Sequence, residues 1–140
     1  MFSNANIAGM LAALVLWASP AYAAPLYSIT ALPANTYAHA INNAGQVVGD
    51  TAVGGEAHAF IWSGGVLTDL GAVGTASRAR AISSNGLVAG YSSSSEESGA
   101  FLRNGSATIP LGTLGGANSF GPGVNATGQV VGQSNNAAGD

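Results

Sequence analysis

Histidine is the residue type best suited to acid–base or metal chemistry near neutral pH, and the sequence contains two, His39 and His58. His58 lies two positions before Phe60 and four before Trp62, so these side chains share one face if the stretch is a strand. A metal site needs three or four converging ligands, and neither histidine has them nearby in sequence. We therefore interpret His58 as a strand-edge histidine satisfied by the backbone, and His39 is an equally weak candidate.

A serine hydrolase triad could be assembled from one of the many serines, His58 and either Asp50 or Asp69. No Gly-x-Ser-x-Gly motif supports it, and serine is common in turns for its own reasons. Asp50, Asp69 and loop carbonyls could also bind calcium, but no dense Asp or Asn pattern recurs along the chain. We predict that the chain is not an enzyme and has no catalytic residue, metal site or cofactor.

Two further patterns have simple structural explanations. The glycine-rich segment 112–116 has no lysine after it, so it does not match a phosphate-binding loop. Segments 104–106 and 125–127 match the glycosylation acceptor pattern and are read as turns.

Aromatic side chains are the remaining candidates for a binding surface. Phe60, Trp62, Tyr91 and Phe101 could together line a sugar-binding face. Internal packing is the stronger interpretation for Phe60 and Phe101, because they are 41 positions apart and that spacing recurs elsewhere.

A ten-residue segment that occurs three times must position all these side chains. Its copies are AINNAGQVVG at 40–49, AISSNGLVAG at 81–90 and GVNATGQVVG at 123–132. The shared glycines Gly45, Gly86 and Gly128 are separated by 41 and 42 positions. A fixed period of this size is typical of an array in which each unit is one supersecondary piece.

Each copy predicts a β-hairpin. Asn42, Ser83 or Asn125 offers a side-chain acceptor at the first turn position, and a glycine follows three positions later. That glycine allows a left-handed backbone, which gives a type I turn closed by a glycine bulge. Short runs rich in Val, Ile and Leu flank each turn and predict strands.

The segments between the hairpins complete a unit of four strands. Residues 58–62 predict a strand, a turn at 63–65 reverses the chain, and residues 66–70 predict its partner. Residues 25–32 resemble 66–70 and predict a strand before the first hairpin, while 51–56 and 92–98 predict polar loops. Glu96 and Glu97 in the latter loop predict a solvated tip.

We expect an all-β domain over 24–140, with four-stranded antiparallel units at about 25–70, 71–111 and 112–140, the last incomplete. Four short strands in this length predict an incomplete β-propeller-like array, and a β-solenoid is the alternative. Phe60, Trp62 and Phe101 would pack between neighbouring units. Such an array exposes an unpaired edge, which predicts self-association and poor solubility.

The order of these motifs also carries a family resemblance. The chain has His58-Ala59-Phe60, then Asp69-Leu70-Gly71, and the hairpin segment in three copies. This order resembles the extracellular HAF repeat of bacterial secreted proteins, over nearly all of 27–140. Gly99 stands in place of the histidine in the second copy, and Arg103 in place of Trp62. The resemblance implies a secreted or surface-attached protein and brings no catalytic residues.

The first residues predict export. An apolar run at 7–17 is followed by Ala21-Tyr22-Ala23, a small-residue cleavage pattern, so residues 1–23 predict a signal peptide. No Lys or Arg precedes the run, and an uncleaved anchor is the alternative. The run is shorter than the roughly 20 residues that span a bilayer, so we expect no membrane span after cleavage.

Composition narrows the classes of function. The chain has three Arg, no Lys and a net charge of −3, so it lacks a basic face for nucleic acid. It has no Cys, which excludes disulfides and thiolate chemistry. We predict an exported structural or interaction module that binds a protein or a glycan. The alternative is the first part of a secreted propeller hydrolase whose catalytic residues lie beyond Asp140.

Overall fold

A computed structural model describes residues 27–72 and 74–139. By its contacts the chain divides into Met1–Ala31 and Leu32–Asp140, and all the described strands belong to the second part. The described residues contain no helix, so the expected all-β class is confirmed, and no helix in them is long and apolar enough to cross a membrane. The predicted signal peptide, 1–23, lies outside the described residues.

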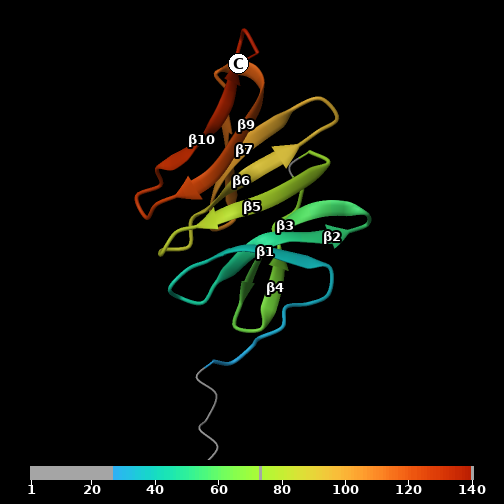
Figure 1. Cartoon of the computed structure of the whole chain (residues 1–140), viewed down its shortest axis with the longest axis vertical. Coiled ribbons are helices and arrows are strands. Elements are labelled where there is room, and N and C mark those ends of the chain that lie inside the picture. The colour runs from blue at the N-terminus through green and yellow to red at the C-terminus, as the bar shows by residue number, and fades with distance from the viewer. Residues whose placement is uncertain (1–26, 73, 140) are drawn as a thin grey trace, which may run out of the picture. The chain divides into compact units, whose positions relative to one another are not determined.

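The first sheet is an antiparallel meander of four strands in the order β1-β2-β3-β4 (Figure 1). Their bounds are Thr36–Ile41 for β1, Val47–Val53 for β2, Glu56–Ser63 for β3 and Val66–Asp69 for β4. The strands on both sides of the first hairpin turn and the pair at 58–62 and 66–70 were all expected.

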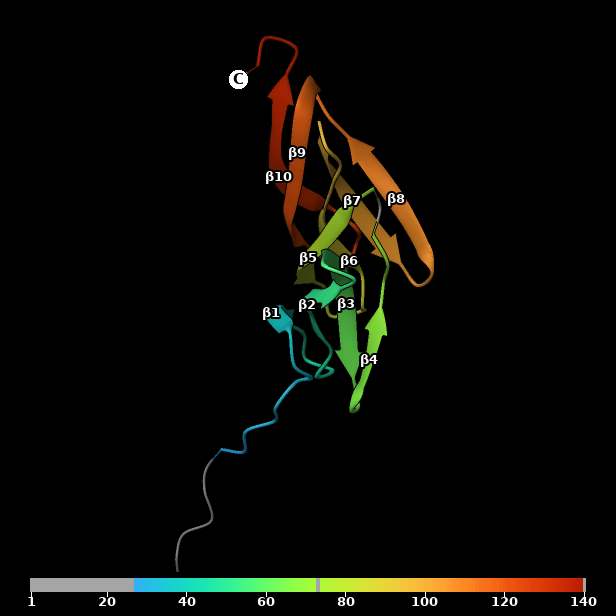
Figure 2. The ribbon, with the colours of Figure 1, turned by 90° about the vertical axis from the view of Figure 1, so that its right-hand side faces the viewer.

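The second sheet has six strands and is mixed. Its strands are β5 (Ala76–Ile82), β6 (Val88–Ser93), β7 (Ser98–Asn104), β8 (Ala107–Gly112), β9 (Gly115–Val124) and β10 (Val130–Asn136). They follow the order β10-β9-β7-β6-β5, with β8 paired to β7 off this path. Figure 2 shows β8 running apart from the β9–β10 pair.

The prediction of separate, purely antiparallel units is therefore wrong at one point. β8 pairs with β7 only from Ala100 onward, which leaves the edge of β7 free at Ser98. Asn118 of β9 occupies that place in a parallel pairing with Ser98, and its side-chain oxygen accepts the Ser98 N–H at 3.1 Å. The described residues form no closed barrel or propeller.

The three predicted hairpin turns are confirmed. The N–H groups of Gly45, Gly86 and Gly128 donate to the carbonyls three residues earlier at 3.0, 3.1 and 3.1 Å. Their φ angles are +73°, +86° and +83°, the left-handed conformation expected of a glycine bulge. In the first turn the side-chain oxygen of Asn42 also accepts the N–H groups of Ala44 and Gln46.

A second set of glycines allows the backbones of two neighbouring strands to come close together: Gly49, Gly90 and Gly132. A Cβ atom at these positions would collide with the carbonyl oxygens of Tyr37, Arg78 and Phe120 respectively. Each of these oxygens lies on the neighbouring strand beside a register shift, where the two backbones approach most closely. The last glycine of each repeated segment is thus required by packing.

Side chains from both sheets form the hydrophobic core. The buried cluster contains Val48 and Ala59 of the first sheet and Ala79, Val88 and Phe101 of the second. Phe101 therefore packs between sheets, as expected. Phe60 is also buried but lies outside this cluster, and Trp62 is half-buried, so their packing between units stays a prediction.

Two predicted segments differ from the structure. Residues 27–32 form no strand, and β1 begins only at Thr36, after Pro33 and after Asn35 with φ +61°. No strand among the described residues pairs with them, and residues 25–26 lie outside the described part. The predicted loop at 51–56 is mostly strand, because Gly54 and Gly55 alone make the turn with φ +62° and +95°.

Candidate functional site

His58 is paired with a carboxylate instead of with the backbone, which corrects the expectation. Its Nδ1 donates to Asp69 Oδ2 at 2.9 Å, from β3 to β4. The side chains are 20% and 40% exposed. Burial raises the pKa of Asp69, but the hydrogen bonds from His58 and from the Gly71 N–H, together with the His58 charge, outweigh it and lower the pKa below its usual value. The pair joins two strands of one sheet.

His39 is also paired, in a cluster that spans both sheets. Its Nε2 donates to Asp50 Oδ1 at 2.6 Å, and Arg78 Nε of β5 lies 3.7 Å from the same oxygen. Tyr37, Asp50 and Arg78 line a cleft of about 280 Å³ with their neighbours. The carboxylate of the nearly buried Asp50 therefore contacts the Arg78 guanidinium from the second sheet and accepts a hydrogen bond from the His39 imidazole of its own sheet.

A phenol and two guanidinium groups meet between β5 and β6 of the second sheet. Arg78 and Arg80 donate to Tyr91 Oη at 3.4 and 3.1 Å, and the Arg80 guanidinium lies 5.4 Å from the centre of the Tyr91 ring. Phe120 packs edge-on against that ring at 4.9 Å. Burial raises the pKa of Tyr91, but the hydrogen bonds and charges of the two arginines outweigh this and lower it below its usual value.

The clusters around Asp50 and Tyr91 occupy equivalent places. Tyr37 pairs with Asp50 in the first sheet, and Arg78 pairs with Tyr91 in the second. Residues 37, 39 and 50 of the first sheet are each 41 positions before residues 78, 80 and 91 of the second. The His39–Asp50 pair therefore corresponds to Arg80 and Tyr91. One backbone arrangement therefore carries a histidine–carboxylate pair in the first sheet and an arginine–tyrosine group in the second.

Ser77 and Ser119 make equivalent bridges that sequence reasoning missed. Ser77 Oγ accepts the Ala59 N–H at 2.9 Å and donates to the Gly71 carbonyl at 2.5 Å. Ser119 Oγ accepts the Ala100 N–H at 2.8 Å and donates to the Gly112 carbonyl at 2.6 Å. The 42-position spacing of these two serines, equal to that of Gly86 and Gly128, was the signal that could have revealed them.

The candidate catalytic and calcium residues do not converge. His58 meets Asp69 and His39 meets Asp50, but within residues 27–72 and 74–139 no serine hydrogen-bonds either imidazole. Nor does any group of three or more His, Asp or Glu in this part of the chain lie close enough together to hold a metal ion. The polar side chains singled out in the sequence thus connect strands and sheets.

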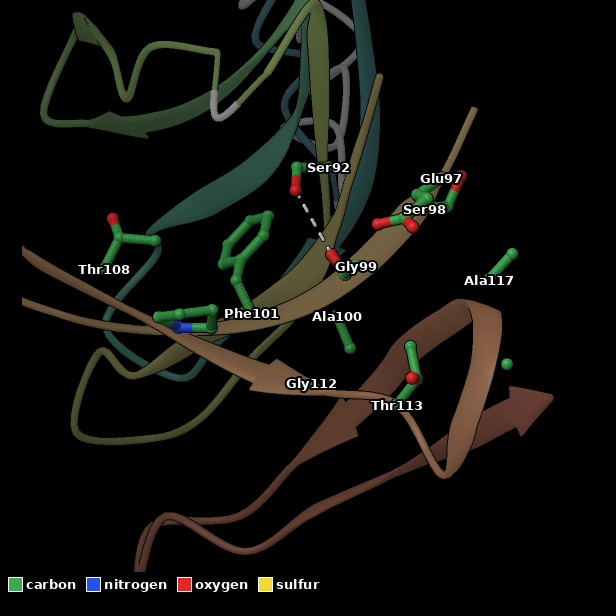
Figure 3. A pocket seen from close by; sticks show the side chains of 12 residues that line it. Ser92, Glu97, Ser98, Gly99, Ala100, Phe101, Thr108, Gly112, Thr113 and Ala117 are labelled. Carbon is green, nitrogen blue, oxygen red and sulfur yellow. Dashed lines mark hydrogen bonds between the residues drawn. The ribbon is translucent and has the colours of Figure 1, made fainter. Parts of the chain in front are cut away.

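A cavity of about 360 Å³ lies beside β7 where β8 separates from it (Figure 3). Gly99, Phe101, Pro110, Glu97 and Thr113 are among the residues that line it. Figure 3 shows Phe101 and Ala100 pointing to opposite faces of β7, and Ser92 Oγ donating to the Gly99 carbonyl at 3.3 Å. The lining combines hydroxyl groups, one carboxylate and an apolar wall.

This cavity exists because two side chains of the first sheet have no counterpart in the second. Gly99 faces Ser92 as His58 faces Thr51, and Pro110 faces Phe101 as Asp69 faces Phe60. The His58–Asp69 pair is therefore replaced by a glycine and a proline. Neither partner of the pair is present at the equivalent positions of the second sheet.

Comparison with known protein families, curated proteins and solved structures finds no match to this chain.

Proposed function

We propose that this chain is an exported, non-enzymatic β-repeat protein that serves as a structural or interaction module outside the cell or at its surface. In this proposal the repeated segments at about 25–70, 71–111 and 112–140 are successive units of a propeller-like array. Its ligand is a protein or a glycan bound on the variable side chains of the array.

One observation carries this proposal: the backbone framework recurs while the side chains on it change. The turns, the close-approach glycines and the serine bridges are equivalent from unit to unit. On that framework the place of the His39–Asp50 pair is taken by Arg80 and Tyr91, and the place of the His58–Asp69 pair is taken by a glycine and a proline beside a cavity. Repeat proteins that bind partners characteristically keep packing residues and vary surface residues in this way.

The proposed export rests on the sequence of residues 1–23 and is tested by processing. A tagged full chain expressed in a bacterial host should appear outside the cytoplasm with Ala24 as its first residue, as read by terminal sequencing. Replacement of both Ala21 and Ala23 by Glu should block cleavage, because the peptidase requires small residues there. A wild-type chain that stays intact in the cytoplasm would overturn the export part of the proposal.

The interaction role is tested by binding. The full chain should retain ligands from panels of bacterial glycans and of surface proteins, and substitution of variable residues such as Arg80 should alter retention. Substitution of the exposed Ser106, which makes no side-chain hydrogen bond in the described structure, is the matched control. Retention of nothing by the folded chain would contradict the interaction role.

A further inference from the structure

In the first sheet, the place equivalent to the cavity beside β7 is filled by the side chain of His58. There, the imidazole ring of His58 lies on the same strand face as Phe60 and bonds to Asp69 across to β4. In the second sheet Gly99 and Pro110 leave that space open, and the cavity extends to about 360 Å³. The cavity therefore includes the place that the His58 side chain occupies in the first sheet.

The space above the Gly99 backbone is open. A Cβ atom placed there would have no neighbour nearer than Ser92 Oγ, at 3.9 Å. By contrast, a Cβ at Gly90 on the adjacent strand would collide with the backbone of Arg78. Gly99 is thus a glycine without a packing requirement, and a ring can enter above it.

The chemistry of the lining selects the kind of ring. Phe101 and Pro110 supply flat apolar walls, and Ser92 and Ser98 supply hydroxyl groups. Glu97 is the one charged residue of the lining, and within the described ranges its carboxylate accepts no hydrogen bond. A flat ring with N–H donors and the capacity for positive charge satisfies each of these groups.

We propose that this cavity binds an imidazole ring, the histidine side chain of a partner peptide. The ring lies above Gly99 against Pro110 and donates to Glu97, which takes the role that Asp69 has for His58. The inference deepens the proposed interaction role by naming one site and its ligand, and it does not depend on export.

The test uses N-acetyl-histidine methylamide as the probe and the full chain at pH 6, where the histidine imidazole is about three-quarters protonated. A ligand of this size should bind with a dissociation constant of about 1 mM, seen as shifts of the Gly99, Gly112 and Gly116 amide resonances. Free imidazole is the second arm and separates ring recognition from recognition of the peptide groups. The phenylalanine analogue is the control that lacks N–H donors on the ring.

Two variants make the result specific. Gly99→His with Pro110→Asp rebuilds the pair of the first sheet inside the cavity and should weaken probe binding at least about tenfold by occupying the site. Glu97→Gln, at an exposed position that cannot unfold the sheet, should weaken binding about tenfold because a charge-assisted hydrogen bond is lost.

The outcomes are distinct. Binding that both variants weaken supports the inference, whether or not free imidazole also binds. No binding of the histidine probe, equal binding of the phenylalanine analogue, or equal binding to the filled variant would overturn it. If the histidine probe fails but other panel ligands are retained, the inference falls and the interaction role stands.

Discussion

Ser77 Oγ accepts the main-chain N–H of Ala59 at 2.9 Å, and this bond crosses from the second sheet to the first. It lies where β4 ends, just after the last bond of that strand, from Leu70 N–H to the Ala59 carbonyl. Where β4 ends, the Ala59 N–H on β3 and the Gly71 carbonyl have no partner in the strand pairing, and the Ser77 hydroxyl hydrogen-bonds to both. The same solution at Ser119 closes the end of β8.

Replacement of Ser77 by Ala should destabilise the chain by about 1–3 kcal/mol, because Ser77 is buried and the change leaves two polar backbone groups without partners. Urea unfolding followed by circular dichroism measures this. Ser106→Ala, at an exposed position without a side-chain hydrogen bond, should change stability by less than about 0.5 kcal/mol. Equal effects of the two substitutions would show that the bridge contributes nothing.

Sequence reasoning predicted the backbone pattern because turns and strands are local. The Asn-to-Gly turn at 42–45 depends on a side-chain acceptor and a left-handed glycine within four residues. The same reasoning failed at 27–32, where the composition suits a strand but none of the strands that the structure describes pairs with it. A strand requires a neighbour, which a local pattern does not supply.

The contacts between sheets were the part that sequence reasoning could not reach. The pairing of Asp50 with Arg78 depends on how one sheet packs on the next. The contact of Tyr91 on β6 with Phe120 on β9 depends on the strand order within the second sheet. His58 has no distinguishing neighbour in sequence, and its partner Asp69 is 11 positions away on another strand. The recurrence at 41 or 42 positions identifies equivalent positions of the repeat, but it does not say which residues contact each other.

Gly90→Ala should destabilise the chain by roughly 3 kcal/mol, the upper part of the range for overpacking, because its Cβ would collide with the Arg78 carbonyl. Gly99→Ala, on the neighbouring strand, is the matched control and should be nearly neutral, since its Cβ would enter open space. Thermal unfolding of both variants tests the difference. A Gly99→Ala variant as unstable as Gly90→Ala would refute the distinction between the two glycines.

Asn42→Ala should cost about 1 kcal/mol more than Asn125→Ala, although both residues begin the same kind of turn. Both side-chain oxygens accept two backbone N–H groups, but only Asn42 Nδ2 also donates to the Ser83 carbonyl of the next hairpin, at 3.0 Å. Asn42 is nearly buried there, whereas Asn125 is exposed. The extra loss is one buried hydrogen bond, and denaturant unfolding of the two variants measures it. Equal losses would place the whole effect in the turns themselves.

The Asp69 carboxylate gives a pH-dependent contribution to stability whose direction follows from its pKa. The pKa in the folded state is below the usual 3.8, so the unfolded state binds the proton more readily. The stabilisation is therefore complete above about pH 5 and is lost as the pH falls through the folded-state pKa, below 3.8. Because the side chain is 40% exposed, solvent screening limits its size to roughly 0.2–1 kcal/mol.

Comparison of the wild type with Asp69→Asn measures this contribution. The difference in unfolding free energy should be constant from pH 6 to 5, should shrink below pH 3.8, and should disappear where the carboxyl group of the folded state is protonated. In a His58→Gln background the difference should be smaller at every pH, because the Gly71 N–H remains as the main partner of the carboxylate. A difference that grows on acidification would show that Asp69 titrates in the opposite sense, and that its pairing with His58 does not stabilise the folded chain.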